Sequence, residues 1–212
     1  MLLDVPIYNL PVLILASASE GRRKLLKGYR FRVIPSGVRE VRRRGLRATC
    51  VANARLKADA VARLHPHDWI LAADTMIEFE GKVYGKPRDR KAAVRLLRRM
   101  AGKTHVLGTG AVLQKGTFRI VKYVTSKVTL HDDPPVARIV ARRDPTGFAG
   151  GYAIQEKNDP LIARIEGSVS NVIGLPLEAL EPLLRKLPDG EAAPRIKSAR
   201  PRRALFRNTL LI

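Results

Sequence analysis

The sequence contains a single cysteine, Cys50, among its 212 residues. One cysteine excludes an intramolecular disulfide and a zinc site built from cysteines. The four histidines show no spacing typical of metal ligands, apart from the close pair His65 and His67. We interpret this pair as part of a solvated loop after a helix. Metal chemistry that depends on sulfur or clustered imidazole is therefore not expected.

Long apolar runs and known phosphate loops are also missing. No apolar run approaches the roughly 20 residues that span a bilayer. Residues 1–14 are apolar but contain Asp4 and Pro6 and lack a basic beginning, which favours a lead-in to a strand over a signal peptide. The Walker pattern GxxxxGK[ST] does not occur in the chain. We expect a cytoplasmic protein without a membrane segment.

Acidic residues are scarce relative to basic ones. Lysine and arginine number 40 against 19 acids, which gives a formal charge of +21. Nucleic-acid binding, a small polyanionic substrate and a generally basic surface all explain this excess. Aromatic residues make up 5% of the chain, so a base-stacking platform for single strands is poorly supplied. Basic residues concentrate in residues 195–207, and we expect a folded domain over residues 1–187 and a basic tail over 188–212.

Apolar residues alternate between strand-like and helix-like spacing along the chain. The spacing predicts strands over residues 12–16, 29–35, 69–73, 76–79, 105–114, 117–130 and 161–166. It predicts helices over residues 22–27, 47–64, 89–100, 134–143 and 176–187. Residues 17–21, 147–155 and 167–174 are small, polar or glycine-rich, and we expect loops there. The order favours one α/β domain, or two small lobes that share a cleft.

Asp74 is the first candidate for a functional carboxylate. It follows directly on the apolar segment WILAA of residues 69–73. Open α/β sheets bind ligands outside the carboxyl ends of their strands, where a carboxylate can hold a divalent cation or activate a water. Position alone is equally compatible with a helix cap or a turn former.

Two loops supply further candidates. Ser17 lies in the loop of residues 17–21, and Arg22 follows it. Hydroxyls, backbone N–H groups and guanidinium forks suit a triphosphate, although a capped basic helix explains the same residues. Lys86 lies between a glycine and a proline that fix its loop, but it also fits an ordinary surface lysine.

Three more residues carry no distinctive signal individually. Glu40 and Lys57 are unremarkable in their local sequence. Gln155 follows a glycine-rich segment, where its amide could hydrogen-bond a base edge or backbone groups.

Taken in chain order, these segments resemble the Maf family, the septum-formation-like nucleoside triphosphate pyrophosphatases. The segments that carry the resemblance are LILASASEGRRKLL, LAADTMIEFEGKVYGKP, LLRRMAGKTHVLGTGAVL, GGYAIQ and RIEGSVSNVIGLPLEAL. They extend over residues 13–187, nearly the whole chain apart from the basic tail. The resemblance implies a mixed, twisted sheet with flanking helices and two lobes around a central cleft.

The resemblance also implies a role for each candidate. Asp74 matches the family's proton-accepting aspartate, and Ser17 and Arg22 match positions that contact phosphates. Glu40, Lys57 and Lys86 match polar residues of the family that line the cleft around the metal and the triphosphate. Thr75 and Gln155 match positions that are linked to base choice in the branch that cleaves dTTP and UTP. A divalent cation, Mg²⁺ or Mn²⁺, would be held by Glu40 and Asp74.

One segment departs from the family pattern. Gly21 aligns with the first arginine of the pair found in the dTTP/UTP branch, and Glu20 replaces a proline. This departure leaves the preferred base open, including modified nucleotides, although Thr75 and Gln155 favour dTTP and UTP. A shift of one residue in the alignment would let Arg22 take the role of the missing arginine.

The implied reaction is hydrolysis of a nucleoside triphosphate to the monophosphate and pyrophosphate. Family members are commonly dimeric, so a homodimer is also expected. Two alternatives stay open: a phosphatase that releases orthophosphate, and a nucleic-acid-binding protein that uses its positive charge and basic tail.

Overall fold

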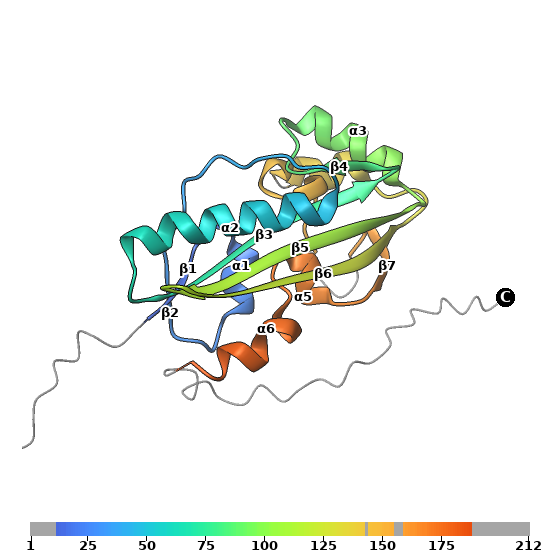
Figure 1. Cartoon of the computed structure of the whole chain (residues 1–212). Coiled ribbons are helices and arrows are strands. Elements are labelled where there is room, and N and C mark those ends of the chain that lie inside the picture. Colours follow the sequence, from blue (N-terminus) through green and yellow to red (C-terminus); the bar gives the residue numbers. More distant parts are fainter. Residues whose placement is uncertain (1–11, 143, 155–158, 188–212) are drawn as a thin grey trace, which may run out of the picture.

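The computed structural model describes residues 12–142, 144–154 and 159–187. It confirms the predicted α/β class, because seven strands form one mixed sheet with helices on both faces (Figure 1). The predictions for Gln155 and for the basic tail over residues 188–212 lie outside the described residues.

The sheet has the order β2-β1-β3-β5-β6-β7, and β4 pairs with β3 beyond this path. β1 is parallel to β2 and β3, and the other pairs are antiparallel. The predicted long hairpin is confirmed by β5 and β6, which pair along their whole length. The strands are β1 (Leu13–Leu15), β2 (Phe31–Val33), β3 (Trp69–Phe79), β4 (Lys82–Tyr84), β5 (Thr104–Lys115), β6 (Phe118–Leu130) and β7 (Ile162–Glu166).

Most helices begin and end near their predicted bounds. Ser19 caps the first helix by accepting a hydrogen bond from the Arg22 N–H, and Asp89 caps the third through the Ala92 N–H at 2.6 Å. One 3-10 turn, Pro145–Gly147, ends where the predicted glycine-rich loop begins, and a second, Ala149–Gly151, lies within that loop. The helices are α1 (Glu20–Leu25), α2 (Leu46–Leu64), α3 (Arg90–Met100), α4 (Val136–Arg142), α5 (Val169–Ile173) and α6 (Leu177–Leu184).

Two local predictions are wrong. β3 does not end before Asp74 but continues to Phe79, so Asp74 lies in the middle of a strand. The predicted polar loop of residues 167–174 contains the short helix α5, which Ser168 caps and Gly174 ends at a φ of 119°. Five residues are too few to show helical periodicity in a sequence.

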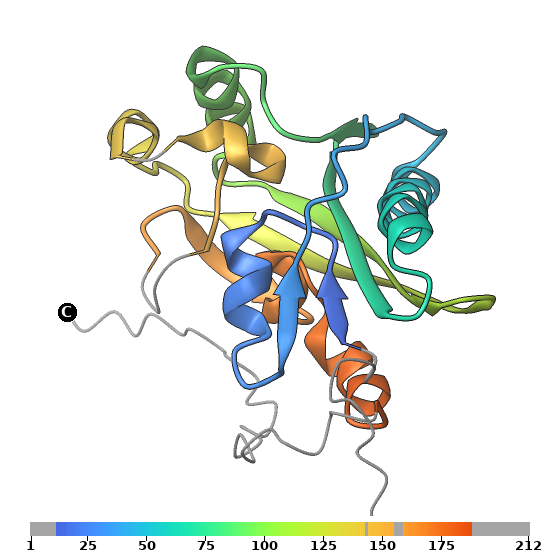
Figure 2. The ribbon, with the colours of Figure 1, turned by 90° about the vertical axis from the view of Figure 1, so that its left-hand side faces the viewer.

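Alternate residues of β3 face opposite sides of the sheet. On one face, Ile70, Ala72 and Met76 pack against α2, which runs along the sheet (Figures 1 and 2). On the other face, Leu71 and Ala73 belong to a cluster with β1 and α6. Further along that face, β3 packs in a second cluster with α3 and α4. Asp74 and Thr75 lie between apolar clusters, one on each face, so the centre of β3 forms a polar seam.

Two glycines of β5 let α2 lie close to the sheet. Gly110 pairs with Asp74 and therefore faces α2. A Cβ atom added at Gly110 would lie 2.7 Å from the backbone carbon of Cys50 and 2.8 Å from the Val51 nitrogen. At Gly108, an added Cβ would lie 3.0 Å from Leu46. The absence of side chains at these positions sets the distance between α2 and the polar seam.

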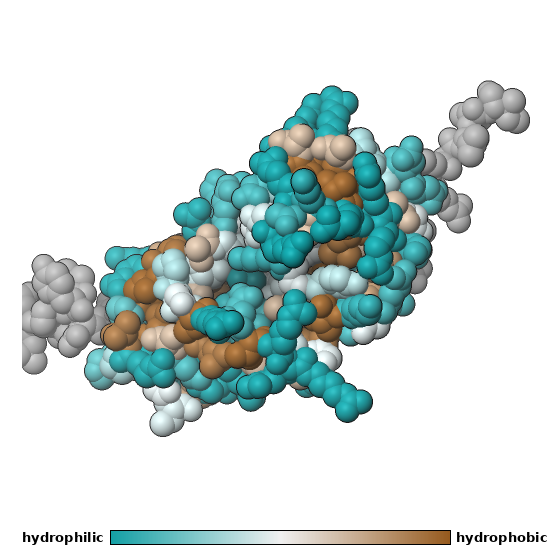
Figure 3. Space-filling model, turned by 90° about the horizontal axis from the view of Figure 1, so that it is seen from above, coloured by the Kyte–Doolittle hydropathy of each residue, from teal (hydrophilic) through white to brown (hydrophobic). Residues whose placement is uncertain are grey.

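Among the described residues, no helix is long and apolar enough to cross a membrane. Seen from above, the surface is largely hydrophilic, and its hydrophobic residues form smaller separate areas (Figure 3).

His105 predicts a specific pH dependence of stability. The side chain is 2% exposed, its Nε2 lies 2.6 Å from the Tyr152 hydroxyl, and its Nδ1 has no partner among the described residues. Burial lowers the pKa of His105 to about 4. The unfolded chain, with an ordinary pKa near 6.5, therefore binds this proton more readily. The neutral His105 side chain therefore contributes fully to the unfolding free energy above pH 6.5. As the pH falls from 6.5 towards 4, the unfolding free energy decreases by about 3 kcal/mol.

Urea unfolding at pH 7.0, 5.5 and 4.5 measures this loss. We expect His105→Leu to flatten the dependence of the unfolding free energy on pH, relative to the wild type. His67→Gln is the matched control, since His67 is exposed and should keep the wild-type slope. Equal slopes in the wild type and His105→Leu would contradict the assignment.

Candidate active site

The carboxylate of Asp74 lies at the centre of the polar seam and is held by two residues of α2. It is 3% exposed. Lys57 Nζ donates to Asp74 Oδ1 at 2.6 Å, and Asn53 Nδ2 donates to Oδ2 at 3.0 Å. Asn53 and Lys57 are one helical turn apart, so α2 presents both to the sheet from the same face. Each carboxylate oxygen is therefore positioned by a separate donor.

Glu40 joins this group from the segment before α2. Lys57 Nζ also donates to Glu40 Oε1 at 2.7 Å, so one ammonium bridges two carboxylates. Asn53 fixes the same segment, because its Oδ1 accepts a hydrogen bond from the Val41 N–H at 2.7 Å. The predicted set Glu40, Lys57 and Asp74 is thus brought together, and Asn53 connects its two ends.

The two carboxyl groups have opposite pKa shifts. Burial raises the pKa of Asp74; the charge and hydrogen bond of Lys57 oppose this rise, and the charge of Glu40 adds to it. At the less buried Glu40, burial also raises the pKa, but Lys57 and the nearby Lys86 more than offset it and leave the pKa lowered. Asp74 is therefore the better proton acceptor of the two, and Glu40 keeps its negative charge to lower pH.

Ser17, Arg22 and Thr75 meet on the opposite face of β3. Arg22 Nη1 donates to Ser17 Oγ at 2.9 Å, and Arg22 Nη2 donates to Thr75 Oγ1 at 3.1 Å. Arg22 Nε donates to the Gly174 carbonyl oxygen at 2.7 Å. Three of the five N–H groups of this buried guanidinium are therefore used within the protein. Arg22 joins the α1 loop to β3 and to the end of α5.

Close packing accounts for Gly21, the departure from the family pattern. A Cβ added at Gly21 would lie 3.0 Å from Ile173 Cγ2 and 3.1 Å from the Ile173 carbonyl oxygen. Any side chain at this position would require Ile173 to shift by a few tenths of an ångström. The guanidinium of Arg22, one residue later, reaches Thr75 instead.

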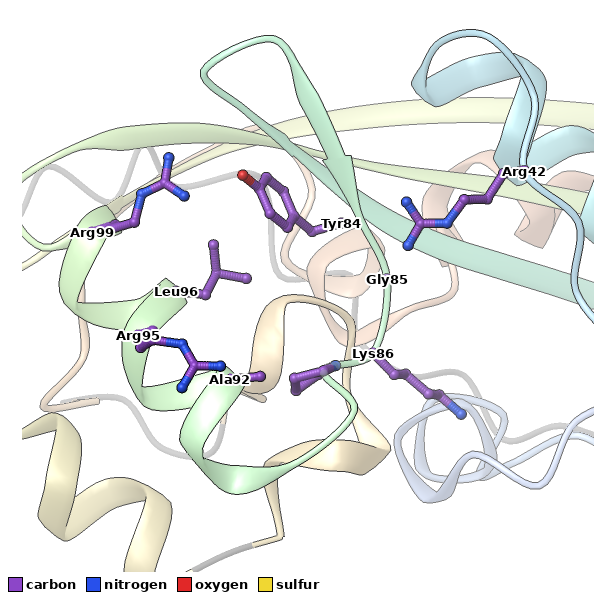
Figure 4. Close-up of a pocket in the computed structure, with 9 residues that line it drawn as sticks. Arg42, Tyr84, Gly85, Lys86, Ala92, Arg95, Leu96 and Arg99 are labelled. Atoms are coloured by element: carbon purple, nitrogen blue, oxygen red, sulfur yellow. The ribbon is translucent and has the colours of Figure 1, made fainter.

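Lys86 is exposed on the loop after β4 and is near enough to Glu40 to lower its pKa. The Gly150 N–H fixes this loop by donating to the Gly85 carbonyl oxygen at 2.9 Å. In Figure 4, the Lys86 side chain points away from α3. Lys86 also lines a cavity of about 300 Å³ between this loop and α3.

The donor set fits a hard divalent cation only in part. Glu40 Oε1 and Asp74 Oδ1 converge on one positive atom, Lys57 Nζ, and carboxylate oxygens are the ligands that Mg²⁺ and Mn²⁺ prefer. Within the described ranges, no group of three or more His, Cys, Asp or Glu side chains could hold a metal ion. A cation bound here would therefore need phosphate or water oxygens as its other ligands.

Two polar residues of this region were not among the sequence candidates. Asn53 was missed, although a polar residue one turn before Lys57 on the buried face of a helix is a recognisable signal. Thr109 is fully buried; its Oγ1 lies 3.0 Å from Thr75 Oγ1 and donates to the Asn171 carbonyl oxygen at 3.2 Å. Local sequence gives no sign of these contacts.

Most of the chain is similar to known proteins. A family model described as "Maf-like protein" matches residues 12–187. A "dTTP/UTP pyrophosphatase" from Myxococcus xanthus (strain DK1622) is 39% identical over 181 residues, which cover 82% of this chain and 92% of that protein. A protein of the same name from Koribacter versatilis (strain Ellin345) is 38% identical over 186 residues, 84% of this chain and 96% of that protein. The chain therefore belongs to the Maf family.

Proposed function

We propose that this protein hydrolyses nucleoside triphosphates to the monophosphate and pyrophosphate, with dTTP and UTP as preferred substrates. The observation that carries the proposal is the buried Asp74 carboxylate, which Lys57 and Asn53 hold in a chain of the Maf family. The relatives named dTTP/UTP pyrophosphatase support the substrate class. Nucleic-acid binding gives no reason for a sheet carboxylate and a helix lysine to be buried together as Asp74 and Lys57 are.

Asp74 acts as the general base in this proposal. It orients a water and takes its proton while the water oxygen bonds to the α-phosphorus. The bond from the α-phosphorus to the oxygen that bridges to the β-phosphate breaks, and pyrophosphate leaves with the electron pair. The raised pKa of Asp74 favours proton uptake, and Lys57 stabilises the carboxylate before the water is bound.

Glu40 and Asp74 are the proposed ligands of Mg²⁺ or Mn²⁺. Such a cation, when bound, neutralises phosphate charge and polarises the reacting oxygens. Lys57 would share its two carboxylate partners with the cation. Because these residues supply only two carboxylates, we expect the metal to bind mainly together with the nucleotide.

Thr75 contributes to base selection in this proposal, next to Arg22 and the Gly174 carbonyl. Ser17 retains its hydroxyl proton for a substrate oxygen, because its Oγ accepts the hydrogen bonds from Arg22 and from the Ser19 N–H. The role of Gln155, the homodimer, the cytoplasmic location and nucleic-acid contact by the tail stay predictions.

A product analysis tests the proposed function. The full chain is incubated with dTTP, UTP, the other natural triphosphates and modified ones, with Mg²⁺ or Mn²⁺, and both phosphorus products are measured. We expect pyrophosphate and the monophosphate, most rapidly from dTTP and UTP. We expect no turnover after the metal is removed with EDTA, and recovery when it is returned. Release of orthophosphate alone would show a phosphatase and contradict the proposal.

A further inference from the structure

The cavity between the loop after β4 and α3 carries more positive charge than the surrounding acids neutralise. Four of its nine lining residues are cationic: Arg42, Lys86, Arg95 and Arg99. Arg99 donates to Glu80 Oε2 at 2.6 Å. Among the described residues, the other three form no ion pair with a carboxylate, and Arg42 donates only to the Val83 carbonyl oxygen, at 3.5 Å. Such a cavity favours an anionic ligand.

The cavity adjoins the candidate active site on its Glu40 side. Lys86 belongs to both, because it lines the cavity and lowers the pKa of Glu40. Arg42 is two residues after Glu40, and the residue between them is tied to Asn53. In Figure 4, Arg42 reaches towards Gly85 from one side of the loop, and Arg95 extends from α3 on the other side.

The buried cations of the site are already engaged with the protein. Lys57 is bound between the carboxylates of Glu40 and Asp74. Arg22 donates three hydrogen bonds, to Ser17, Thr75 and the Gly174 carbonyl oxygen. A pyrophosphate leaving group gains negative charge as it departs and needs further cations to stabilise it. Of the cations that line the adjoining cavity, Arg42, Lys86 and Arg95 form no ion pair with a carboxylate among the described residues.

We propose that this cavity is the subsite for the pyrophosphate portion of the substrate, with Arg42 and Arg95 as its ligands. This inference rests on the proposed function and adds residues that the family resemblance does not supply. The guanidinium groups approach phosphate oxygens with paired N–H donors. Lys86 lines this subsite and is also near Glu40 of the candidate active site. Leu96 and Pro87 supply apolar walls that keep water from one side of the bound anion.

Calorimetric titration of the full chain with inorganic pyrophosphate tests the subsite without turnover. We expect Arg95→Gln and Arg42→Gln each to weaken pyrophosphate binding about tenfold, which corresponds to about 1.4 kcal/mol. Arg98→Gln is the matched control, because Arg98 is exposed on the same helix but does not line the cavity. Its affinity for pyrophosphate should stay at the wild-type value. Binding of the nucleoside monophosphate should be unchanged in all three variants.

Wild-type affinity for pyrophosphate in the Arg42→Gln, Arg95→Gln double variant would overturn the subsite. So would a short oligonucleotide that binds the wild type more tightly than pyrophosphate does and loses this binding in the double variant, since the cavity would then serve a nucleic acid. The product analysis separates the two proposals. If the protein releases pyrophosphate from dTTP, but pyrophosphate inhibits both variants as strongly as the wild type, the proposed function stands and this subsite does not.

Discussion

Asp74→Asn is expected to lower kcat for pyrophosphate release by about 10³-fold, within the range that a general base contributes. Asparagine has nearly the same shape and still accepts a hydrogen bond from Lys57, but its amide cannot take the proton of the attacking water. Both oxygens of Asp74 are bound in the fold, by Lys57 at 2.6 Å and Asn53 at 3.0 Å. The amide oxygen can stay towards Lys57, but the amide nitrogen would then face the Asn53 Nδ2 donor, so the substitution removes the base and one hydrogen bond to α2.

Steady-state kinetics with dTTP and a thermal unfolding curve measure the two parts of this prediction. Asp59→Asn is the matched control, because Asp59 on the same helix also pairs with a cation, but that cation is Arg119 of β6, which is not part of the candidate site. It should retain wild-type turnover. Near wild-type turnover of every triphosphate by a folded Asp74→Asn variant would refute the role of Asp74.

Gly110→Ala is expected to cost about 3 kcal/mol of unfolding free energy, the upper part of the usual range for overpacking. The new Cβ would lie 2.7 to 2.8 Å from backbone atoms of Cys50 and Val51, and helix backbone cannot rotate away as a flexible side chain can. Relief requires α2 to move away from the sheet. Because α2 carries Asn53 and Lys57, the surviving folded protein should also lose most of its activity.

Urea unfolding followed by circular dichroism gives the free energy, and the product assay gives the activity. Gly147→Ala serves as the comparison, since an added Cβ there meets no atom within 4 Å and Gly147 has no positive φ. That variant should match the wild type in both measurements. If Gly110→Ala did so as well, the close contact between α2 and β5 would not set the site's geometry.

The sequence predicted the class of the fold, its long hairpin and most of its helices because these elements carry clear apolar periodicity. The end of the strand before Asp74 was predicted wrongly for a physical reason. A polar pair after WILAA normally marks the surface, whereas here Asp74 and Thr75 stay inside β3 because α2 and Arg22 supply their hydrogen-bond partners. Those partners are distant in the chain, so the local sequence pattern around Asp74 does not indicate them.

The sequence indicated candidate residues but not their connections. The family resemblance pointed to Ser17, Arg22, Glu40, Lys57, Asp74 and Lys86, and the fold brings them to two faces of one strand and the adjoining loop. The motifs did not indicate that one ammonium bridges Glu40 and Asp74, or that Arg22 is bound to the Gly174 carbonyl 152 residues away. Such contacts depend on the register between α2 and the sheet, which no single segment encodes.

The position of Asp74 inside β3 has a consequence for local opening of the molecule. Residues at strand ends and in loops exchange their amide hydrogens through small fluctuations, whereas central strands exchange only when the whole domain opens. Residues 70–78 pair without interruption with residues 106–114 of β5, and Asp74 is at the middle of that pairing. We therefore expect the Asp74 amide to exchange only when the whole domain opens, and local opening near the site to be confined to the loops around it, such as those that carry Glu40 and Lys86.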